Sequence, residues 1–236
     1  MNTLFKAVLT CTALFVSSSA MAQKAGDNII SGGLASINPH ASLGPLTSTG
    51  PAAVPFNATT AGATASIASA TTVSLGWLHM FSDHLGSEVT IGVPPKLTVD
   101  VQLVSGSHPG AASAKALTPT AIGKYFFGTS ASQVRPYLGL GVTHASFSSV
   151  KANTGDPLVS NLAGSGASLS SSWAPVYNAG ISYNINERWS INGSITYIPV
   201  KTTATFQGAG AGTGTTTSGR LKINPTDYVI RVGYKF

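Results

Sequence analysis

The clearest pattern in the chain is the alternation of apolar and polar residues at its carboxyl end. Every second residue from 228 to 236 is aromatic or aliphatic, and the positions between them are small or cationic. The apolar set is Tyr228, Ile230, Val232, Tyr234 and Phe236. Because neighbouring side chains of a β-strand point to opposite faces, the pattern predicts a strand with one face toward lipid and the other toward a polar interior. The alternation alone leaves a strand of a soluble sandwich as the alternative.

Two upstream segments show the same two-faced pattern. Residues 189–197 carry Trp189, Ile195 and Tyr197 on one face and serine, asparagine and threonine on the other. Residues 173–183 alternate in the same way, and the short stretch between the two segments predicts a β-hairpin. Trp and Tyr near strand ends suit the headgroup region of a bilayer, although the same rings are compatible with an ordinary protein core.

Weaker versions of this pattern bring the predicted number of strands to eight. The five additional predicted strands are 28–37, 71–81, 86–104, 115–127 and 135–148. Short turns at 82–85, 128–134 and 185–188 alternate with longer connections. In outer-membrane barrels the short turns face the periplasm and the long loops face the exterior, so both chain ends are expected on the periplasmic side.

The long connections and the prolines mark where this regular pattern is interrupted. The stretches 38–70, 149–170 and 207–218 are rich in Gly, Ala, Ser and Thr and are expected to be extracellular loops; the first is also compatible with disorder. A proline has no N–H for a strand ladder, so bulges or local gaps in the wall are expected at such residues. The prolines within or beside predicted strands are Pro94, Pro95, Pro119, Pro175 and Pro199.

The amino terminus has the parts of a secretion signal. Lys6 precedes an apolar run at residues 7–16, and a small-residue site follows at residues 20–22. The run would barely reach across a hydrocarbon core of ~30 Å, which argues against an uncleaved anchor. We therefore expect residues 1–22 to be a cleaved signal peptide and residues 23–236 to be one outer-membrane β-barrel.

Composition supports a membrane location. Charged residues make up 8% of the chain, against ~25% in ordinary soluble domains. No later run approaches the roughly 18–20 apolar residues of a transmembrane helix, so an all-β fold, an eight-stranded antiparallel transmembrane β-barrel, is expected.

The net charge of +6 reflects few acidic residues, and no basic cluster that would neutralise phosphates occurs, so no nucleic-acid partner is expected. Cys11, the only cysteine, precedes the expected mature start, which excludes disulfides and cysteine-based sites.

Several segments resemble the OmpW family of small outer-membrane proteins. They are 134–142, then Trp173 through Asn178-Ala179-Gly180 to Tyr183, Asn186-Glu187-Arg188-Trp189, and Lys222-Ile223-Asn224-Pro225 followed by Gly233-Tyr234-Lys235-Phe236. Their order and spacing carry the resemblance, which covers most of the mature chain. The closing aromatic strand also resembles the signal by which the barrel-assembly machinery recognises outer-membrane proteins. Departures fall mainly in the amino-terminal third, where residues 28–34 lack the family's usual aromatic and basic residues.

The resemblance implies a narrow hydrophobic channel or pocket that passes small hydrophobic molecules across the outer membrane. Its expected partners are outer-membrane lipid, a small hydrophobic ligand and the barrel-assembly machinery, with no cofactor. Eight strands leave room only for side chains or one small ligand, so a wide aqueous pore is not expected. An apolar compound is instead expected to leave sideways where prolines loosen the wall. The candidates for this lateral opening are Pro94, Pro95, Pro119 and Pro199.

Two sets of residues are candidates for the interior and the ligand site. The charged side chains at inward positions are expected to pair and close the lumen, and binding or gating of a charged solute is the alternative. This set is Glu88, Asp100, Lys124, Arg135, Arg231 and Lys235. Ligand contact is expected near the outer mouth, where apolar side chains are available. This second set is Leu46, Val54, Phe56, Leu103, Leu158, Leu162 and Phe206.

Two other functional classes have to be weighed. A lipid-modifying enzyme needs an assembled catalytic set, and no serine-histidine-acid spacing stands out, so the chain is predicted not to be an enzyme. The histidines are scattered at His40, His79, His84, His108 and His144. His79 and His84 flank a turn without carboxylate or cysteine neighbours, so no metal site is predicted. A surface receptor or adhesion barrel that acts through its extracellular loops remains the alternative function.

Overall fold

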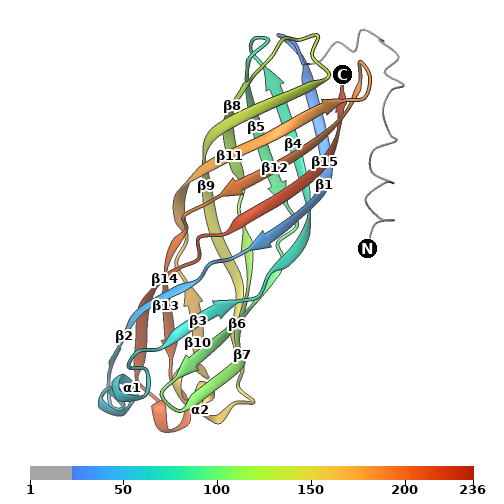
Figure 1. Cartoon of the computed structure of the whole chain (residues 1–236). Helices are drawn as coiled ribbons and strands as arrows, with labels where there is room; N and C mark the ends of the chain where they lie inside the picture. Colours follow the sequence, from blue (N-terminus) through green and yellow to red (C-terminus); the bar gives the residue numbers. More distant parts are fainter. Residues whose placement is uncertain (1–22) are drawn as a thin grey trace, which may run out of the picture.

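The computed structural model describes residues 23–236, and they form an elongated β-barrel (Figure 1). The expected signal peptide, residues 1–22, lies outside the described residues. The strands are β1 (Asn28–Asn38), β2 (Ser42–Thr49), β3 (Thr64–Ile67), β4 (Ala70–Met80), β5 (Leu85–Gly92), β6 (Lys96–Leu103), β7 (Gly106–Leu117), β8 (Thr120–Phe126), β9 (Val134–Ala152), β10 (Gly166–Leu169), β11 (Ser172–Asn184), β12 (Trp189–Tyr197), β13 (Lys201–Gln207), β14 (Thr216–Lys222) and β15 (Thr226–Lys235). The helices are α1 (Ala53–Thr59), α2 (Pro157–Ala163) and the short 3-10 helix η1 (Gly210–Gly212). No helix within residues 23–236 has the length and hydropathy to span a membrane.

Eight strands close into a ring, which confirms the predicted antiparallel barrel. Their order is β9-β11-β12-β15-β1-β4-β5-β8, and β8 pairs back onto β9. A closed ring leaves no unpaired strand edge, as a hydrocarbon environment requires. The three short turns lie at the end of the barrel where β1 begins and β15 ends (Figure 1). By the usual asymmetry of outer-membrane barrels, this is the periplasmic end.

The outward face of these eight strands is apolar, as the alternation predicted. On β12, Trp189 and Ile195 are exposed, whereas Ser190 and Thr196 are buried inside. Beyond the barrel strands and their periplasmic turns, the large hydrophobic side chains exposed within residues 23–236 are Val54, Val93 and Val104. An apolar band confined to one part of the wall is the surface that acyl chains contact.

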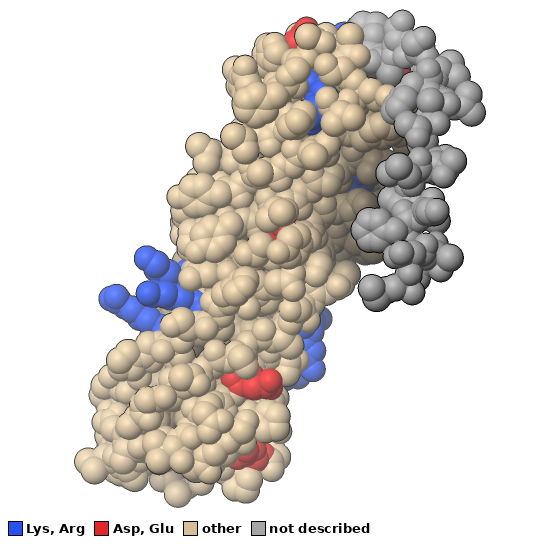
Figure 2. Space-filling model, in the orientation of Figure 1, with Lys and Arg blue, Asp and Glu red and all other residues tan. Residues whose placement is uncertain are grey.

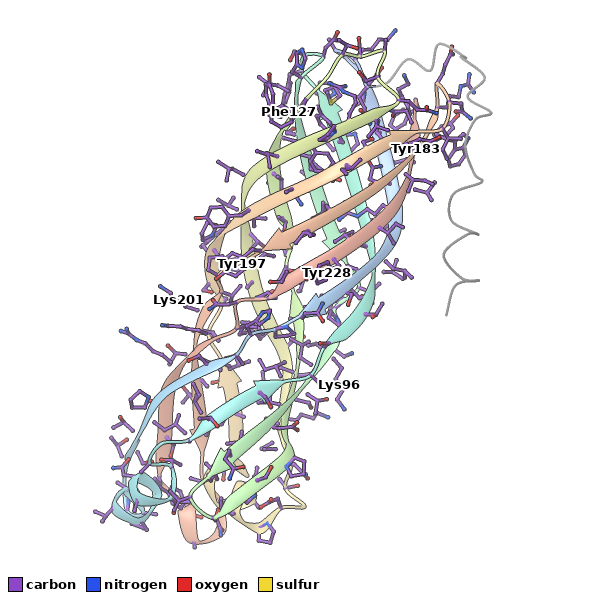
Figure 3. All side chains as sticks on the ribbon, viewed as in Figure 1. Lys96, Phe127, Tyr183, Tyr197, Lys201 and Tyr228 are labelled. Carbon is purple, nitrogen blue, oxygen red and sulfur yellow. The ribbon has the colours of Figure 1, made fainter. Side chains whose placement is uncertain are left out.

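Aromatic rings lie at both ends of this band. Figure 3 shows Phe127 and Tyr183 near the periplasmic end and Tyr197 and Tyr228 near the other end. All four rings are exposed on the outside. Aromatic belts of this kind sit at the level of lipid headgroups, so the apolar wall between them is the membrane-spanning part.

The wall continues beyond the membrane-spanning part as an outer half built from two sheets. One sheet has the order β10-β13-β14-β2, and the other has the order β3-β6-β7 with the distal part of β9. The predicted single strands 86–104 and 115–127 are therefore wrong. The first is divided between β5 and β6, and the second between β7 and β8. The physical cause is Pro94, Pro95 and Pro119, which lie at these breaks and cannot donate to a ladder.

The stretches expected to be loops are largely ordered. Residues 38–70 contain β2, α1 and β3, so the suggestion of disorder is wrong. Backbone pairing needs no large side chains, and a few apolar residues such as Leu46 and Phe56 supply the core beneath. The other two stretches contain α2, β10, η1 and part of β14.

Candidate functional site

The outer half encloses an apolar cavity of about 110 Å³. Within residues 23–236 no charged residue lines it, and Thr60, Ser113 and Thr217 supply the only hydroxyl-bearing side chains on its wall. The remaining lining comes from aliphatic residues and Phe206, contributed by both sheets and by α2. A space lined almost entirely by apolar side chains offers contact and shape but no charged anchor, so it suits a nonpolar ligand.

Two features of the sequence produce the empty space. Alternation on β13 and β14 turns Ala204 and Leu221 inward, while Lys201 and Lys222 remain exposed. Many inward positions hold alanine, which fills little volume. These alanines are Ala65, Ala111, Ala112, Ala114, Ala152, Ala163 and Ala204. The same low-complexity composition that predicted loops thus forms the wall of a cavity.

Helix α2 covers part of the cavity and is tied to the hairpin between β6 and β7. Its buried residues Val159 and Leu162 line the cavity. The carboxylate of Asp156 accepts hydrogen bonds from the backbone N–H groups of Leu158 and Val159, which caps the helix. His108 Nδ1 lies 2.6 Å from the second carboxylate oxygen, and this hydrogen bond, together with the capping N–H groups, lowers the pKa of Asp156.

His108 also brings a serine close to this carboxylate. Its Nε2 lies 3.1 Å from the hydroxyl of Ser105, so the structure assembles a serine-histidine-acid contact that the sequence spacing did not suggest. Ser105 is exposed on a hairpin turn and lines none of the cavities of the outer half or the lumen described here. Because Asp156 caps α2, the contact fastens the helix to the hairpin.

An apolar plug separates the cavity from the barrel lumen. Ile198, Val200 and Ile223 pack there with Ile122 and Val176, and all are nearly inaccessible. Below the plug lies a second cavity of about 80 Å³, whose wall includes Asn178, Thr196 and Asp227. The interior therefore changes from apolar to polar at the waist of the molecule, where the two halves meet.

A charged layer crosses the lumen beneath the polar cavity. The carboxylate of Glu88 contacts Lys124 Nζ through one oxygen and lies 2.8 Å from Arg231 Nη1 through the other. Arg231 also donates to the hydroxyl of Ser74. Gly76 makes room for this layer, because a Cβ at that position would lie 2.7 Å from Glu88 Oε1. We refer to Glu88, Lys124 and Arg231 as the charge layer.

The periplasmic mouth is filled as well. Arg135 is fully buried and donates to the backbone carbonyls of Gln23, Asp83 and Phe127. The side chain of Gln23 donates in turn to Ser182 across the mouth. The charge layer and this mouth leave no wide aqueous path along the barrel axis.

The strand pairing of the wall is interrupted at the waist, between two neighbouring connections. Pairing of β5 with β8 ends at Thr90 and Thr120, and pairing of β6 with β7 begins at Lys96 and Lys115. Between these points the facing stretches 91–95 and 116–119 share one backbone hydrogen bond, from Ala116 to Pro95, at 3.4 Å. We call these two stretches the wall gap. The polar cavity borders both of them.

The structure separates the four candidate prolines. Pro94, Pro95 and Pro119 lie at the wall gap, whereas Pro199 lies between β12 and β13, on a different side of the ring. Around Pro199 the neighbouring strands stay bridged, because Ile198 donates to Pro225 and Ile223 donates to Val200. Pro199 is thus not part of the same opening.

The other candidate residues are also divided by the structure. Of the apolar set, Leu46, Leu103, Leu162 and Phe206 line the cavity. Phe56 and Leu158 pack in the adjacent core, and Val54 is 82% exposed on α1. Of the charged set, Asp100 lies in the outer half, where it accepts from the Gly110 N–H, because residues 86–104 are not one strand. Lys235 lies near the periplasmic end, 3.3 Å from Asp27.

Several residues that line the cavity were not predicted from the sequence. Leu43, Val101, Leu169 and Leu221 also line the cavity. The signal that could have found Leu221 was the alternation around it, which is short and interrupted by glycine. Within residues 23–236, no three His, Cys, Asp or Glu side chains are arranged to hold a metal ion.

Comparison with known proteins gives concordant matches over nearly the whole chain. The family model described as "OmpW family" matches residues 24–236. Outer membrane protein W of Vibrio cholerae is 30% identical over 233 residues, which cover 97% of each chain. The protein of the same name from Escherichia coli is 28% identical over the full length of both chains. The crystal structure of the outer membrane protein OprG from Pseudomonas aeruginosa superposes with a TM-score of 0.79 at 29% identity, covering 92% of this chain and 99% of that one.

Proposed function

The chain belongs to the OmpW family of outer-membrane proteins, and on this premise we propose that it binds small hydrophobic molecules in its outer cavity and releases them sideways into the bilayer. The family is one of outer-membrane proteins, so the barrel lies in the bacterial outer membrane, and the prediction that the chain is not an enzyme is confirmed. The proposal concerns what the barrel carries and by which route.

The apolar cavity is the observation that carries the binding part of the proposal. An engineered protein cavity of ~150 Å³ with an aliphatic and aromatic lining stays dry and binds benzene. The cavity of about 110 Å³ is of similar size and lining, so it suits a small hydrocarbon or the end of an alkyl chain. The gain comes from moving apolar ligand surface out of water, about 25 cal/mol per Å².

The closed lumen supports the sideways route. A nonpolar molecule that continued along the axis would have to pass the charge layer and the mouth filled by Arg135, where it would separate paired charges. The wall gap borders the polar cavity beneath the apolar plug and has one bridging hydrogen bond, so a ligand that takes this route has to displace the plug before it reaches the gap. A ligand that leaves there emerges at the membrane surface, next to the hydrocarbon that it prefers to water.

Filling the cavity tests the proposal. Ala204 on β13 is buried and lines the cavity, so Ala204→Phe should place a ring in the space. Thr203→Phe adds the same ring one residue away on the exposed face of the strand. We expect Ala204→Phe to reduce binding of the nonpolar fluorophore N-phenyl-1-naphthylamine to the protein in nanodiscs, and to slow its uptake by cells, whereas Thr203→Phe should match the native protein.

Folding of each variant is checked by the shift in gel mobility on heating and by its unfolding midpoint. Native binding and uptake by a folded Ala204→Phe protein would refute the cavity as the ligand site. Deleting residues 38–70 is a poorer test of the receptor alternative, because Leu43, Leu46 and Ala65 line the cavity and would be lost together with the loop surface.

Export and assembly complete the proposal. We infer that residues 1–22 are removed during export, since Lys6, the apolar run at residues 7–16 and the small-residue site at residues 20–22 have the pattern of a cleaved secretion signal. Tyr228, Ile230, Val232 and Phe236 are exposed on the outer face, and Tyr234 packs against Trp189. A row of accessible apolar side chains on the last strand is what the barrel-assembly machinery would contact.

A further inference from the structure

Basic side chains gather at one level of the molecule, just beyond the membrane-spanning wall. Figure 2 shows them on two sides at this level, and Figure 3 places Lys201 on one side and Lys96 on the other. Lys201 lies directly opposite Lys222 in the pairing of β13 with β14, and Arg220 is two residues from Lys222 on the same face. Lys96 lies directly opposite Lys115 in the pairing of β6 with β7.

No pattern along the sequence predicts this arrangement. The five residues are dispersed over residues 96–222 and meet only through strand pairing. The sequence has no run of basic residues, and strand pairing alone brings these five together in two groups. We call Lys96, Lys115, Lys201, Arg220 and Lys222 the basic belt.

No salt bridge in the described part of the chain joins a belt residue to an acidic side chain. The salt bridges within residues 23–236 involve other cations, and all five belt residues are exposed. Asp100, on the same strand as Lys96, accepts a hydrogen bond from the backbone of Gly110. Like charges directly opposite one another destabilise a strand pair. Two such pairs without protein counterions indicate that the neutralising anions come from outside the molecule.

The position of the belt identifies these anions. Tyr197 precedes Lys201 by four residues, and Tyr197 and Tyr228 lie on the barrel side of the belt (Figure 3). Aromatic side chains mark the headgroup level, so the cations lie where headgroup phosphates of the outer leaflet are found. We propose that the basic belt binds the phosphate groups of outer-leaflet lipids at two places on the circumference of the barrel. Phosphate contacts at these places hold the cavity above the membrane and the wall gap at its surface.

The test is lipid binding to the full-length mature protein in a zwitterionic detergent. The probes are lipid A with two phosphates, lipid A with one phosphate, and inorganic pyrophosphate, measured by native mass spectrometry. Each basic side chain near an anionic lipid surface contributes about a fivefold gain in affinity. We expect two double variants, Lys201→Gln with Lys222→Gln and Lys96→Gln with Lys115→Gln, each to bind bisphosphorylated lipid A more than tenfold more weakly than the native protein does. We also expect the native protein to bind lipid A with one phosphate more weakly than lipid A with two.

The matched control removes two exposed cations at the periplasmic end, Lys24→Gln with Arg188→Gln, and should bind lipid A as the native protein does. Lys201→Arg with Lys222→Arg should retain binding, because the charges are kept. Replacing like-charged pairs relieves repulsion, so unfolding midpoints of the belt variants should not fall. Native lipid affinity in both belt variants, or an equal loss in the control, would overturn the proposal. Displacement of lipid A by equimolar pyrophosphate would overturn the assignment to lipid.

Discussion

Removing the negative charge from the charge layer should destabilise the barrel strongly. Glu88→Gln keeps the shape of the side chain but leaves Lys124 and Arg231 facing each other, with side chains only 7% and 11% exposed. Two charge-assisted hydrogen bonds are weakened, each worth about 1.5–3 kcal/mol. Removal of one partner from a buried ion pair typically costs about 3–5 kcal/mol. Both considerations predict a loss of about 3–5 kcal/mol in the free energy of unfolding.

Urea unfolding from lipid vesicles measures this loss. Trp77, Trp173 and Trp189 are exposed on the outer face, so their fluorescence reports departure from lipid. Glu187→Gln, at an exposed position in a periplasmic turn, should change stability by less than about 0.5 kcal/mol. Replacing the whole layer, with Glu88→Leu, Lys124→Met and Arg231→Met together, should restore or exceed native stability, because no charge is left unpaired. If the single and triple variants lose equal stability, unpaired charge is not the cause and the reasoning fails.

Two further predictions concern the route and its cover. Changing the three prolines of the wall gap to alanine restores backbone donors, so it should slow uptake of the fluorophore several-fold without altering its binding. Pro199→Ala, on another side of the ring, should leave uptake unchanged. Equal uptake by the two variants would contradict a lateral exit at this gap. Asp156→Ala should speed amide hydrogen exchange in α2, and Asp156→Asn, which can still cap the helix, should preserve most of the protection. Because the pKa of Asp156 lies below its ordinary value of 3.8, the cap is fully stabilising above that pH and is lost only as the pH falls through the lower folded value. Protection of α2 that declined already at mildly acidic pH would contradict this assignment.

The membrane-spanning half was predictable because lipid acts on every residue of its outer face. A polar side chain at Ile195 or Ile230 would lie in hydrocarbon, so the alternation is kept along whole strands and can be read directly. In the outer half neither face of the wall contacts the hydrocarbon of the bilayer, so outward positions can hold Thr, Ser, Lys or Arg. Strands such as β13 and β14 therefore carry only a weak pattern, and the cavity they enclose was located only in part. The basic belt was not predictable at all, because strand register decides which lysines become neighbours.

The division of the interior at the waist gives the two halves different tasks. A charge layer stabilises a narrow barrel only if positive and negative side chains pair with each other and little water reaches them. The same pairing opposes the passage of a solute along the barrel axis, because the solute would have to separate the paired charges. An apolar cavity placed above such a layer cannot discharge downward without separating Glu88 from its partners. On the proposed route a ligand in this cavity leaves either back to the exterior or past the apolar plug and through the wall gap, and only the second way leads to a solvent that a nonpolar molecule prefers to water. The closed lumen is therefore the reason to expect directional transfer into the membrane, since it removes the axial path and leaves the interrupted wall as the productive exit.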